Sequence, residues 1–410
     1  MFVKHLGNIL KEQSTRKHIW NILYLSNKKP LKKDFPELQT AIFETAKEMS
    51  SWDKELPLSW IHLEVALDHE RDAGSNILTF HLVVELAKKY SLTTSDDEEI
   101  IVFLSYQHEC GHVIFFKDLP DFIILNPSWL IDAFKCLVSP YQFQGPLIDL
   151  EDWTEFWETG RLTSNLISKL FEKVPKLKFM EYKKHLLDVL EKFDIIVKPK
   201  NGNMKMYYLP CMIKSTTFNE ICESFGVHKP SCHRTSWLLL EFEFLPPAIF
   251  NRVLVGYIRM HKVSIESTDN GQRLSLYRGI GVFDINESGS MKLVICAGQN
   301  VIAFQIWIYG NGLHSTFHNY RQTLTDMVDI LSKKYQVCCK YTVKMKCSKS
   351  DYQKTEGRFE CKVLQDSKKY FCPEHSIEHG CLDAYKYWFS NEIVVSYTCQ
   401  LLNIYPKLTS

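Results

Sequence analysis

The feature that most constrains the fold is a run of strand-like segments between residues 233 and 345. The segments read WLLLEFEFL, RVLVGYIRM, GQRLSLYRGIGVFDI, MKLVICAG and VIAFQIWIYG. They are rich in β-branched and aromatic residues, and turns containing Gly, Asn and Ser separate them. The block closes on NYRQTLTDMVDILSKKY, in which Leu324, Met327, Val328 and Leu331 recur at helical spacing. We therefore predict an antiparallel sheet carrying a helix.

The preceding region, residues 56 to 222, favours helices with short strands. TSNLISKLFEKV is a helical pattern, and MEYKKHLLDVLEKF is another, with one apolar stripe formed by Leu186, Leu187, Leu190 and Phe193. Two β-rich runs then flank Asn201-Gly202-Asn203, a sequence typical of a hairpin turn. Helix, helix and hairpin in this order predict a winged helix. The fold class is therefore α+β, with a helical, winged-helix-like first half followed by an antiparallel sheet with a helix.

Residues 18 to 49 predict one strand and one helix. HIWNILYLSNKKP reads as a buried strand that runs into a turn. DFPELQTAIFETAKEM reads as a helix, with Asp34 as its N-cap and Glu37 as the capping-box partner. A single strand cannot bury the apolar face of this helix. We expect the pair to be the last βα unit of a larger α/β domain whose front is absent. The apolar face comprises Leu38, Ile42, Phe43, Ala46 and Met49.

Composition limits the classes of protein that remain. A length of 410 residues suffices for two or three domains, and the formal charge of +1 provides no field that would recruit nucleic acid or a membrane. No secretory signal and no apolar run of membrane-spanning length is present. The 13 cysteines therefore indicate reduced thiols rather than a disulfide framework. We expect a soluble, cytoplasmic protein.

The stretch His108-Glu109-Cys110-Gly111-His112 matches the H-E-x-x-H pattern of zinc peptidases. In such enzymes both histidines lie one turn apart on a continuous helix. Here Gly111 stands where helices commonly end, and Val-Ile-Phe-Phe follows. We expect His112 to begin a strand and to point away from His108. The third-ligand candidates Asp121 and Asp132 are poorly placed, so a zinc metallopeptidase is the weaker alternative.

Several segments resemble, in order, the COR domain, which follows the Roc GTPase domain in Roco proteins such as the leucine-rich-repeat kinases. The resemblance covers roughly residues 55 to 335. It rests on LPLSWIHLEVAL, on DFIILNPSWLIDAFKCLV, on EKFDIIVKPK with YYLPCMI, and on FLPPAIFNRVLVGYIR with LYRGIGVFDI. ILNPSWLIDAF and LPPAIFNRVLV are the most specific of these segments. In this family HECGH falls at an ordinary helix-to-strand junction.

The resemblance also gives the predicted domain boundaries. Residues 1–55 would be the end of a Roc-like domain, 56–225 COR-A, 226–345 COR-B and 346–410 a Cys- and His-rich tail. Asn27-Lys28-Lys29-Pro30 is similar to a base-reading N-K-x-D motif, but Pro replaces the final carboxylate. The sequence contains no G-x-x-x-x-G-K-[ST] phosphate loop and no kinase motifs. We expect no enzymatic activity from this chain.

The family implies a regulatory role, in which COR couples a Roc GTPase to the oligomeric state. The first half of COR would pack against Roc, in the same chain or in another, and the second half would form a homodimer. From the residues alone, we expect Trp60, Trp129 and Phe134 to be core residues rather than interface anchors. Other residues in the family motifs are expected at helix starts or beside them: Asn126 as a cap, Pro127 at the first helical position, and Pro246, Pro247 and Phe250 at a helix or turn before a strand.

A winged helix could instead bind nucleic acid through its second helix. Lys183, Lys184 and His185 would then read the groove, and Lys198, Lys200 and Lys205 would form the wing. A solvated basic face gives the same pattern, and arginine, the usual reader of bases, is nearly absent there. We therefore favour no nucleic-acid partner, and keep this function as the alternative.

The tail contains a group of soft metal ligands. Four of them, Cys347, Cys361, Cys372 and His375, could close a tetrahedral structural Zn²⁺ site, with His379 and Cys381 nearby. The spacings match no standard zinc finger, and free thiols are the simpler interpretation. Structural zinc is the one cofactor that the sequence suggests.

Overall fold

A computed structural model describes residues 34–49, 52–53, 55–89, 97–139, 150–199, 206–268, 271–310, 317–334, 339–360 and 368–389, and the single residues 23, 25, 26 and 28. The chain divides into two compact units, Met1–Leu125 and Asn126–Ser410. In the part described, no helix is long and apolar enough to span a membrane.

In the described part of the first unit, three of the four helices pack with a two-stranded sheet. Its elements are α2 (Asp34–Lys47), α3 (Leu58–Asp72), β1 (Ile77–Thr79), α4 (Phe80–Lys89), α5 (Asp97–Glu109) and β2 (Phe122–Ile124). The strands β1 and β2 are antiparallel, with Ile77 opposite Ile124. One core joins α3, α4, α5 and both strands through Leu63, Val83 and Phe103, which are fully buried.

The helix predicted over residues 34 to 49 is confirmed by α2. The strand predicted over residues 18 to 30 falls largely outside the described residues, and the four that are described there do not belong to a strand. On α2, the side chains of Ile42 and Phe43 are exposed. The apolar face of this helix therefore remains largely uncovered by the described part of the chain.

The second unit begins with a helical region that has the order of a winged helix. Its elements are α6 (Pro127–Val138), α7 (Leu150–Thr159), β3 (Arg161–Thr163), α8 (Ser164–Glu172), α9 (Lys183–Lys192) and β4 (Met206–Tyr208). β3 pairs with β4, and Val197 exchanges two backbone hydrogen bonds with Tyr208. These contacts agree with the predicted winged helix. The proposed hairpin turn at Asn201-Gly202-Asn203 lies outside the described residues.

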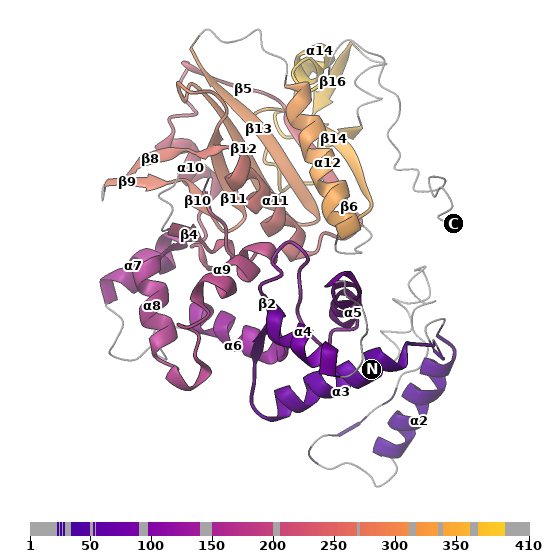
Figure 1. Cartoon of the computed structure of the whole chain (residues 1–410). Coiled ribbons are helices and arrows are strands. Elements are labelled where there is room, and N and C mark those ends of the chain that lie inside the picture. The colour runs from indigo at the N-terminus through magenta and orange to yellow at the C-terminus, as the bar shows by residue number, and fades with distance from the viewer. Residues whose placement is uncertain are drawn as a thin grey trace. The chain divides into compact units, whose positions relative to one another are not determined.

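A large antiparallel sheet dominates the rest of the second unit (Figure 1). Its main path runs β10-β11-β12-β13-β6-β14-β15, and β5 and β7 pair with β13 and β11. The strands are β5 (Cys232–Arg234), β6 (Trp237–Phe242), β7 (Lys262–Val263), β10 (Leu276–Tyr277), β11 (Ile280–Asp284), β12 (Met291–Gly298), β13 (Val301–Tyr309), β14 (Tyr341–Lys346) and β15 (Phe359–Glu360). Two further hairpins pair β8 (Ile265–Thr268) with β9 (Gly271–Leu274) and β16 (Lys369–Cys372) with β17 (Ile377–Gly380).

Helices cover both faces of this sheet. Successive side chains on a strand point to opposite faces, so Leu238 and Leu240 lie in one core and Trp237 and Leu239 in another. The first core includes α11 (Pro247–Met260) and α12 (His318–Lys334), and α12 lies along the sheet in Figure 1. The second core includes α10 (Phe218–Ser224). The predicted sheet with a closing helix is confirmed.

One predicted strand is wrong. RVLVGYIRM, residues 252 to 260, is the second half of the helix α11 rather than a strand. Pro247 occupies the first helical position, where its fixed φ and missing N–H are tolerated. Phe250, Val253, Leu254 and Tyr257 are all buried and lie at helical spacing. Burial on several sides of the helix produces the continuous apolar run that resembled a buried strand.

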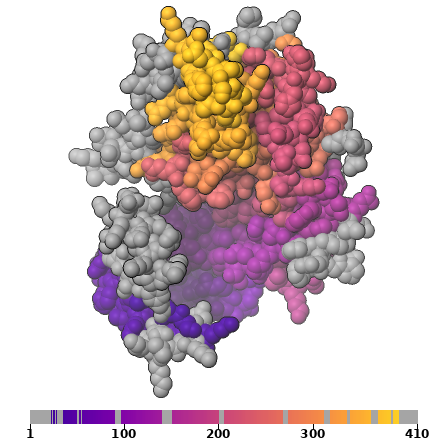
Figure 2. Space-filling view, turned by 180° about the vertical axis from the view of Figure 1, so that it is seen from behind, coloured from indigo at the N-terminus to yellow at the C-terminus, as the bar shows by residue number. Residues whose placement is uncertain are grey.

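The end of the described chain packs back onto the sheet. Trp388 is fully buried, and its indole N–H donates to the Ser236 carbonyl oxygen at 2.9 Å. Phe317 donates its backbone N–H to the Tyr387 carbonyl oxygen at 2.6 Å. In Figure 2 the C-terminal part of the described chain, coloured yellow, forms one continuous region of the surface. Residues 368–389, including α14 (Cys381–Tyr385), therefore contribute to the core of the sheet.

Gly160, between α7 and β3, offers a test of the packing. Its φ is +68°, and an added Cβ would lie 2.5 Å from Ile213 Cγ1. We expect Gly160→Ala to lower the free energy of unfolding by about 3 kcal/mol, the sum of left-handed strain and overpacking. Gly310→Ala is the control, because Gly310 has a φ of +82° with no atom within 4 Å of the added Cβ. Urea unfolding should show a loss of only about 1 kcal/mol there. Equal losses in both variants would contradict the packing at Gly160.

Candidate functional site

The HECGH stretch lies across the end of α5. The helix ends at Glu109, and Gly111 adopts a φ of +79°. His112 donates its backbone N–H to the Gln107 carbonyl oxygen, and Gly111 donates to that of His108, both at 3.0 Å. This pair of bonds is the Schellman arrangement that closes helices at a left-handed glycine. The predicted role of Gly111 as helix terminator is confirmed.

The two histidines of this stretch bind different partners. His108 Nδ1 lies 3.4 Å from the Val113 carbonyl oxygen, whereas His112 Nδ1 lies 2.7 Å from Gln107 Oε1. Glu64 on α3 accepts a hydrogen bond from the Gln107 side chain at 2.6 Å. The strand expected after Gly111 is wrong, because a single bridge between Ile114 and Ile124 replaces it. Among the described residues, one group of Cys and His side chains lies close enough together to hold a metal ion. Neither His108 nor His112 belongs to that group.

The Asn126-Pro127 pair starts α6 as predicted. Asn126 is the N-cap, and its side-chain oxygen accepts the Ser128 backbone N–H at 3.0 Å. Pro127 takes the first helical position. Trp129 is buried, and its indole N–H donates to the Leu177 carbonyl oxygen at 2.8 Å. These residues fix α6 against the segment between α8 and α9.

The other candidates in the family motifs differ in exposure. Trp60 is half-buried and donates its indole N–H to Glu99 Oε1 at 3.2 Å, while Phe134 is also half-buried. Phe250 is a core residue on α11, Pro246 is half-buried, and Pro247 is exposed. Of this group, Pro247 is the one that is open to a partner surface.

Two of the basic side chains that the nucleic-acid alternative would use make internal contacts. Lys183 Nζ donates to the Ser164 carbonyl and hydroxyl oxygens, both at 2.9 Å, and to the Ser168 hydroxyl at 2.7 Å. Burial lowers the pKa of Lys183. Lys198 pairs with Glu191 at 2.8 Å, a hydrogen bond that raises the pKa of this lysine. Lys184 is exposed and His185 half-buried, while Lys200 and Lys205 lie outside the described residues.

Three of the four predicted metal ligands have a described position, and the structure adds a fourth. Cys347, Cys372, His375 and His379 bring one donor atom each to within 4.8 Å of one another. Cys361 lies outside the described residues. Cys381 is buried at the start of α14 and does not belong to the group. His379 is predicted from the sequence only as a neighbour of the ligand set, although it completes a C-x-x-H-x-x-x-H spacing with Cys372 and His375.

The separations within this Cys/His cluster are short. Cys347 Sγ lies 3.3 Å from His379 Nε2 and 3.6 Å from His375 Nδ1. Cys372 Sγ lies 3.2 Å from His375 Nδ1. Both cysteines are buried, and burial raises the pKa of the Cys347 thiol. Burial and the neighbouring His375 lower the pKa of His379.

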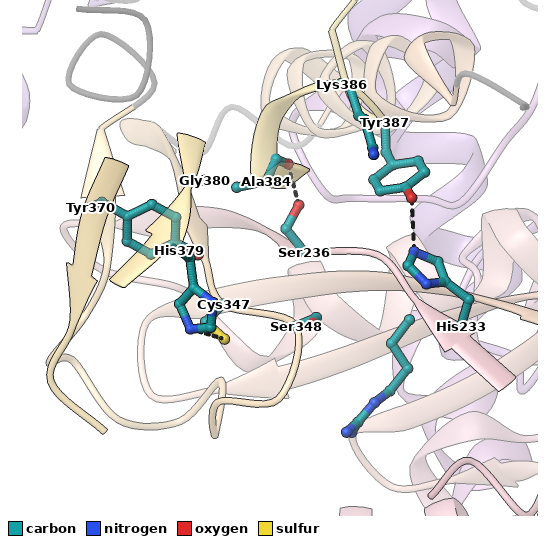
Figure 3. A pocket seen from close by; sticks show the side chains of 11 residues that line it. His233, Ser236, Cys347, Ser348, Tyr370, His379, Gly380, Ala384, Lys386 and Tyr387 are labelled. Carbon is teal, nitrogen blue, oxygen red and sulfur yellow. Dashed lines mark hydrogen bonds between the residues drawn. The ribbon is translucent and has the colours of Figure 1, made fainter. Parts of the chain in front are cut away.

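A cavity in the second unit opens beside this cluster. Figure 3 shows the Cys347 sulfur next to the His379 ring on one side of the cavity. On another side, the Tyr387 hydroxyl lies 2.8 Å from His233 Nε2. Tyr370 also lines the cavity, and its ring lies 5.4 Å from that of His379. The cavity wall is therefore shared between the Cys/His cluster and the end of the described chain.

Comparison with known proteins shows which family the region from α3 to β4 resembles. Residues 57–213 match the family model described as "C-terminal of Roc, COR-A domain". A probable serine/threonine-protein kinase, roco8, from Dictyostelium discoideum is 26% identical over 162 residues. A Roc-COR-CHAT protease from Runella zeae is 27% identical over 111 residues. These matches cover 38% and 25% of the chain, but only 8% and 12% of the two relatives.

A solved structure is also similar in part. It is Methanosarcina barkeri Roco2 RocCORdC bound to GDP, with a TM-score of 0.36 and 13% sequence identity. The similarity covers 48% of this chain and 57% of that one. The chain thus spans about a tenth of the length of the curated relatives and little more than half of this structure.

The geometry at the end of α5 predicts that HECGH holds no metal. We expect His108→Ala and His112→Ala to leave any zinc that co-purifies with the protein unchanged, because the two rings bind different partners. Elemental analysis of the purified variants measures this directly. Stoichiometric zinc that disappears in either variant would restore the peptidase interpretation.

Proposed function

Residues 57–213 are a COR-A domain of the Roco type, and from this premise we propose that the chain is a non-catalytic regulatory module that couples a Roc GTPase to oligomeric state. The match to the COR-A family carries the proposal. The sequence supports it, since it contains neither a phosphate loop nor the kinase motifs. The Roc domain would be supplied by the same protein or by another chain.

An apolar stripe on α3 supports binding of a Roc domain. Leu58, Ile61 and Val65 lie at helical spacing and are 66%, 45% and 48% exposed. Single exposed apolar residues are normal, but three on one stripe suggest a covered surface. α3 begins the COR-A match, and COR-A is by description the region C-terminal of Roc. A Roc domain is therefore the partner that we assign to this stripe.

The loop between β6 and α11 supports self-association. Phe244 in the loop is 66% exposed, and Pro247 and Ala248, the first two residues of α11, are exposed as well. These three residues, the β6–α11 tip, belong to the segment FLPPAIFNR that resembles COR-B. Two-fold pairing of identical patches is the commonest way in which proteins cover such a surface. A stable pair would bury on the order of 1,200 to 2,000 Å², so further residues around the tip must take part.

The α3 stripe can be tested with charge substitutions. We expect Ile61→Asp with Val65→Asp to weaken binding to Roc domains encoded in the same genome at least about tenfold, or 1.4 kcal/mol, because two carboxylates would be desolvated. Calorimetry with GDP-loaded and GTP-analogue-loaded Roc domains gives the affinities. Ile131→Asp on α6 is the control, since Ile131 is also exposed, at 52%, but lies off the stripe.

Two outcomes would argue against this assignment. Binding that is equally weak in the Ile131 control would place the Roc surface elsewhere. If the wild-type chain binds none of the Roc domains but binds duplex DNA tightly, with a steep salt dependence, that result would favour the nucleic-acid alternative.

The β6–α11 tip can be tested by sedimentation of the full chain. We expect dimers at tens of micromolar, and we expect Phe244→Asp to raise the dimer dissociation constant at least about tenfold, since a charge would enter the interface. Ile330→Asp on α12 is the matched control, because Ile330 is 62% exposed and lies outside the tip.

A further variant separates this contact from association through α2. Ile42→Asp with Phe43→Asp removes the exposed apolar face of α2 and should leave the dimer intact. Loss of the dimer in this variant, or no change in Phe244→Asp, would contradict the proposed interface.

A further inference from the structure

The Cys/His cluster joins two separate parts of the fold. Cys347 follows directly after β14, which pairs with β6 inside the large sheet. Cys372 ends β16, His375 lies in the turn, and His379 lies in β17. The cluster thus connects the end of β14 in the sheet to the β16–β17 hairpin.

The donor separations match a tetrahedral metal site. Zinc bonds of about 2.3 Å to sulfur and about 2.0–2.1 Å to nitrogen, at tetrahedral angles, place sulfur and nitrogen about 3.5 Å apart. Three of the four sulfur–nitrogen pairs are 3.2, 3.3 and 3.6 Å apart, and all four donor atoms lie within 4.8 Å of one another. These three pairs therefore already have the separations that a tetrahedral zinc site requires, and the four donor atoms converge on one region.

Without a metal the four side chains would be poor partners for one another. A thiol is a weak donor and a weak acceptor, so sulfur–imidazole contacts contribute little. The ten described cysteines are all free, and no disulfide explains the approach of Cys347 to Cys372. Coordination accounts for the convergence of two buried thiols and two half-buried imidazoles in one place.

The surrounding backbone holds the donors in position. Ser376 adopts a φ of +55° and donates its backbone N–H to the Cys372 carbonyl oxygen at 2.9 Å, which closes the turn that carries His375. Ser350 donates its backbone N–H to the Cys347 carbonyl oxygen at 3.1 Å, and its hydroxyl oxygen lies 3.7 Å from Cys372 Sγ. The two backbone bonds fix the turns that carry the donors, and the Ser350 hydroxyl is placed to donate to a Cys372 thiolate, a contact of the kind that orients metal ligands.

A buried lysine next to the cluster fixes the same segments. Lys346 Nζ lies 2.5 Å from Glu374 Oε1, and donates to the carbonyl oxygens of Asp351 at 2.6 Å and Lys354 at 2.8 Å. Its side chain is fully buried. The residues on either side of Cys347 and Cys372 are thus tied together independently of the four donors.

We propose that Cys347, Cys372, His375 and His379 bind one structural Zn²⁺ ion. Tetrahedral coordination by two sulfurs and two nitrogens is characteristic of zinc. Four protein ligands close the coordination sphere and leave no position for a water or a substrate, so the ion is structural rather than catalytic. It fastens the β16–β17 hairpin to the end of β14. The site is independent of the proposed COR function.

Metal content of the full-length protein tests the site. We expect about one zinc ion per chain after purification under reducing conditions and dialysis against metal-free buffer. Cys372→Ser and His379→Gln should each reduce this content at least about fivefold. Cys381→Ser is the matched control, because Cys381 is equally buried and follows shortly in sequence but lies outside the cluster. Its zinc content should not change.

A rescue variant separates ligand loss from misfolding. His375→Cys creates a Cys₃His set, which also binds structural zinc, so it should retain about one ion per chain. Replacement of zinc by Co²⁺ should give the visible spectrum of a tetrahedral site in the wild type, and a spectrum with more thiolate character in this variant. His375→Gln should give neither.

Thermal unfolding supplies a measurement that needs no variant. A strong chelator should lower the midpoint of the second unit, and added Zn²⁺ but not Mg²⁺ should restore it. Three results would overturn the proposal: less than about a tenth of an ion per chain with no response to the chelator, iron in place of zinc, or equal zinc loss in Cys381→Ser. None of these results bears on Roc binding through α3.

Discussion

The second unit depends on the complete burial of one strand, β13. The first eight of its nine residues are buried, so side chains on both faces of the sheet need an apolar cover. On one face α11 and α12 provide it, and on the other α10 and the aromatic rings of Trp237 and Tyr352 do so. The end of the described chain also covers this first face, because Trp388 lies in the first core and is fully buried.

This burial also explains which parts of the fold the sequence could predict. α12 has one apolar stripe and one polar face, and its helical spacing is unambiguous. β12 and β13 follow each other with a two-residue turn, and their apolar runs suit a buried strand. α11 is different, because its apolar residues extend around much of the helix and include Val253 and Val255. The better signal was Pro246-Pro247, which sets a helix start whatever follows.

The Cys/His cluster shows a similar limit. Residue type was enough to select Cys347, Cys372 and His375, because cysteine and histidine are the ligands of structural zinc. The remaining ligand depends on how the chain turns. The pairing of Cys372 with Ile377 and of Tyr370 with His379 forms a tight hairpin that returns His379 to the cluster. Nothing in the spacing of the cysteines fixes that register, so Cys361 was an equally reasonable choice from the sequence.

The winged-helix region and the sheet are joined firmly enough for one to act on the other. Asp194, just after α9, is bound by Arg259 of α11 at 2.8 Å and by Lys334 of α12 at 3.4 Å. Each of these partly exposed pairs contributes at most about 1 kcal/mol. The larger contribution comes from the shared core, in which Val197 and Tyr208 pack with α11 and the sheet. A partner that displaces α9 must therefore either open this core or move α11 and α12 with it. Under the proposed function, a change received by the winged-helix region would reach the proposed dimer contact at the start of α11 through this junction.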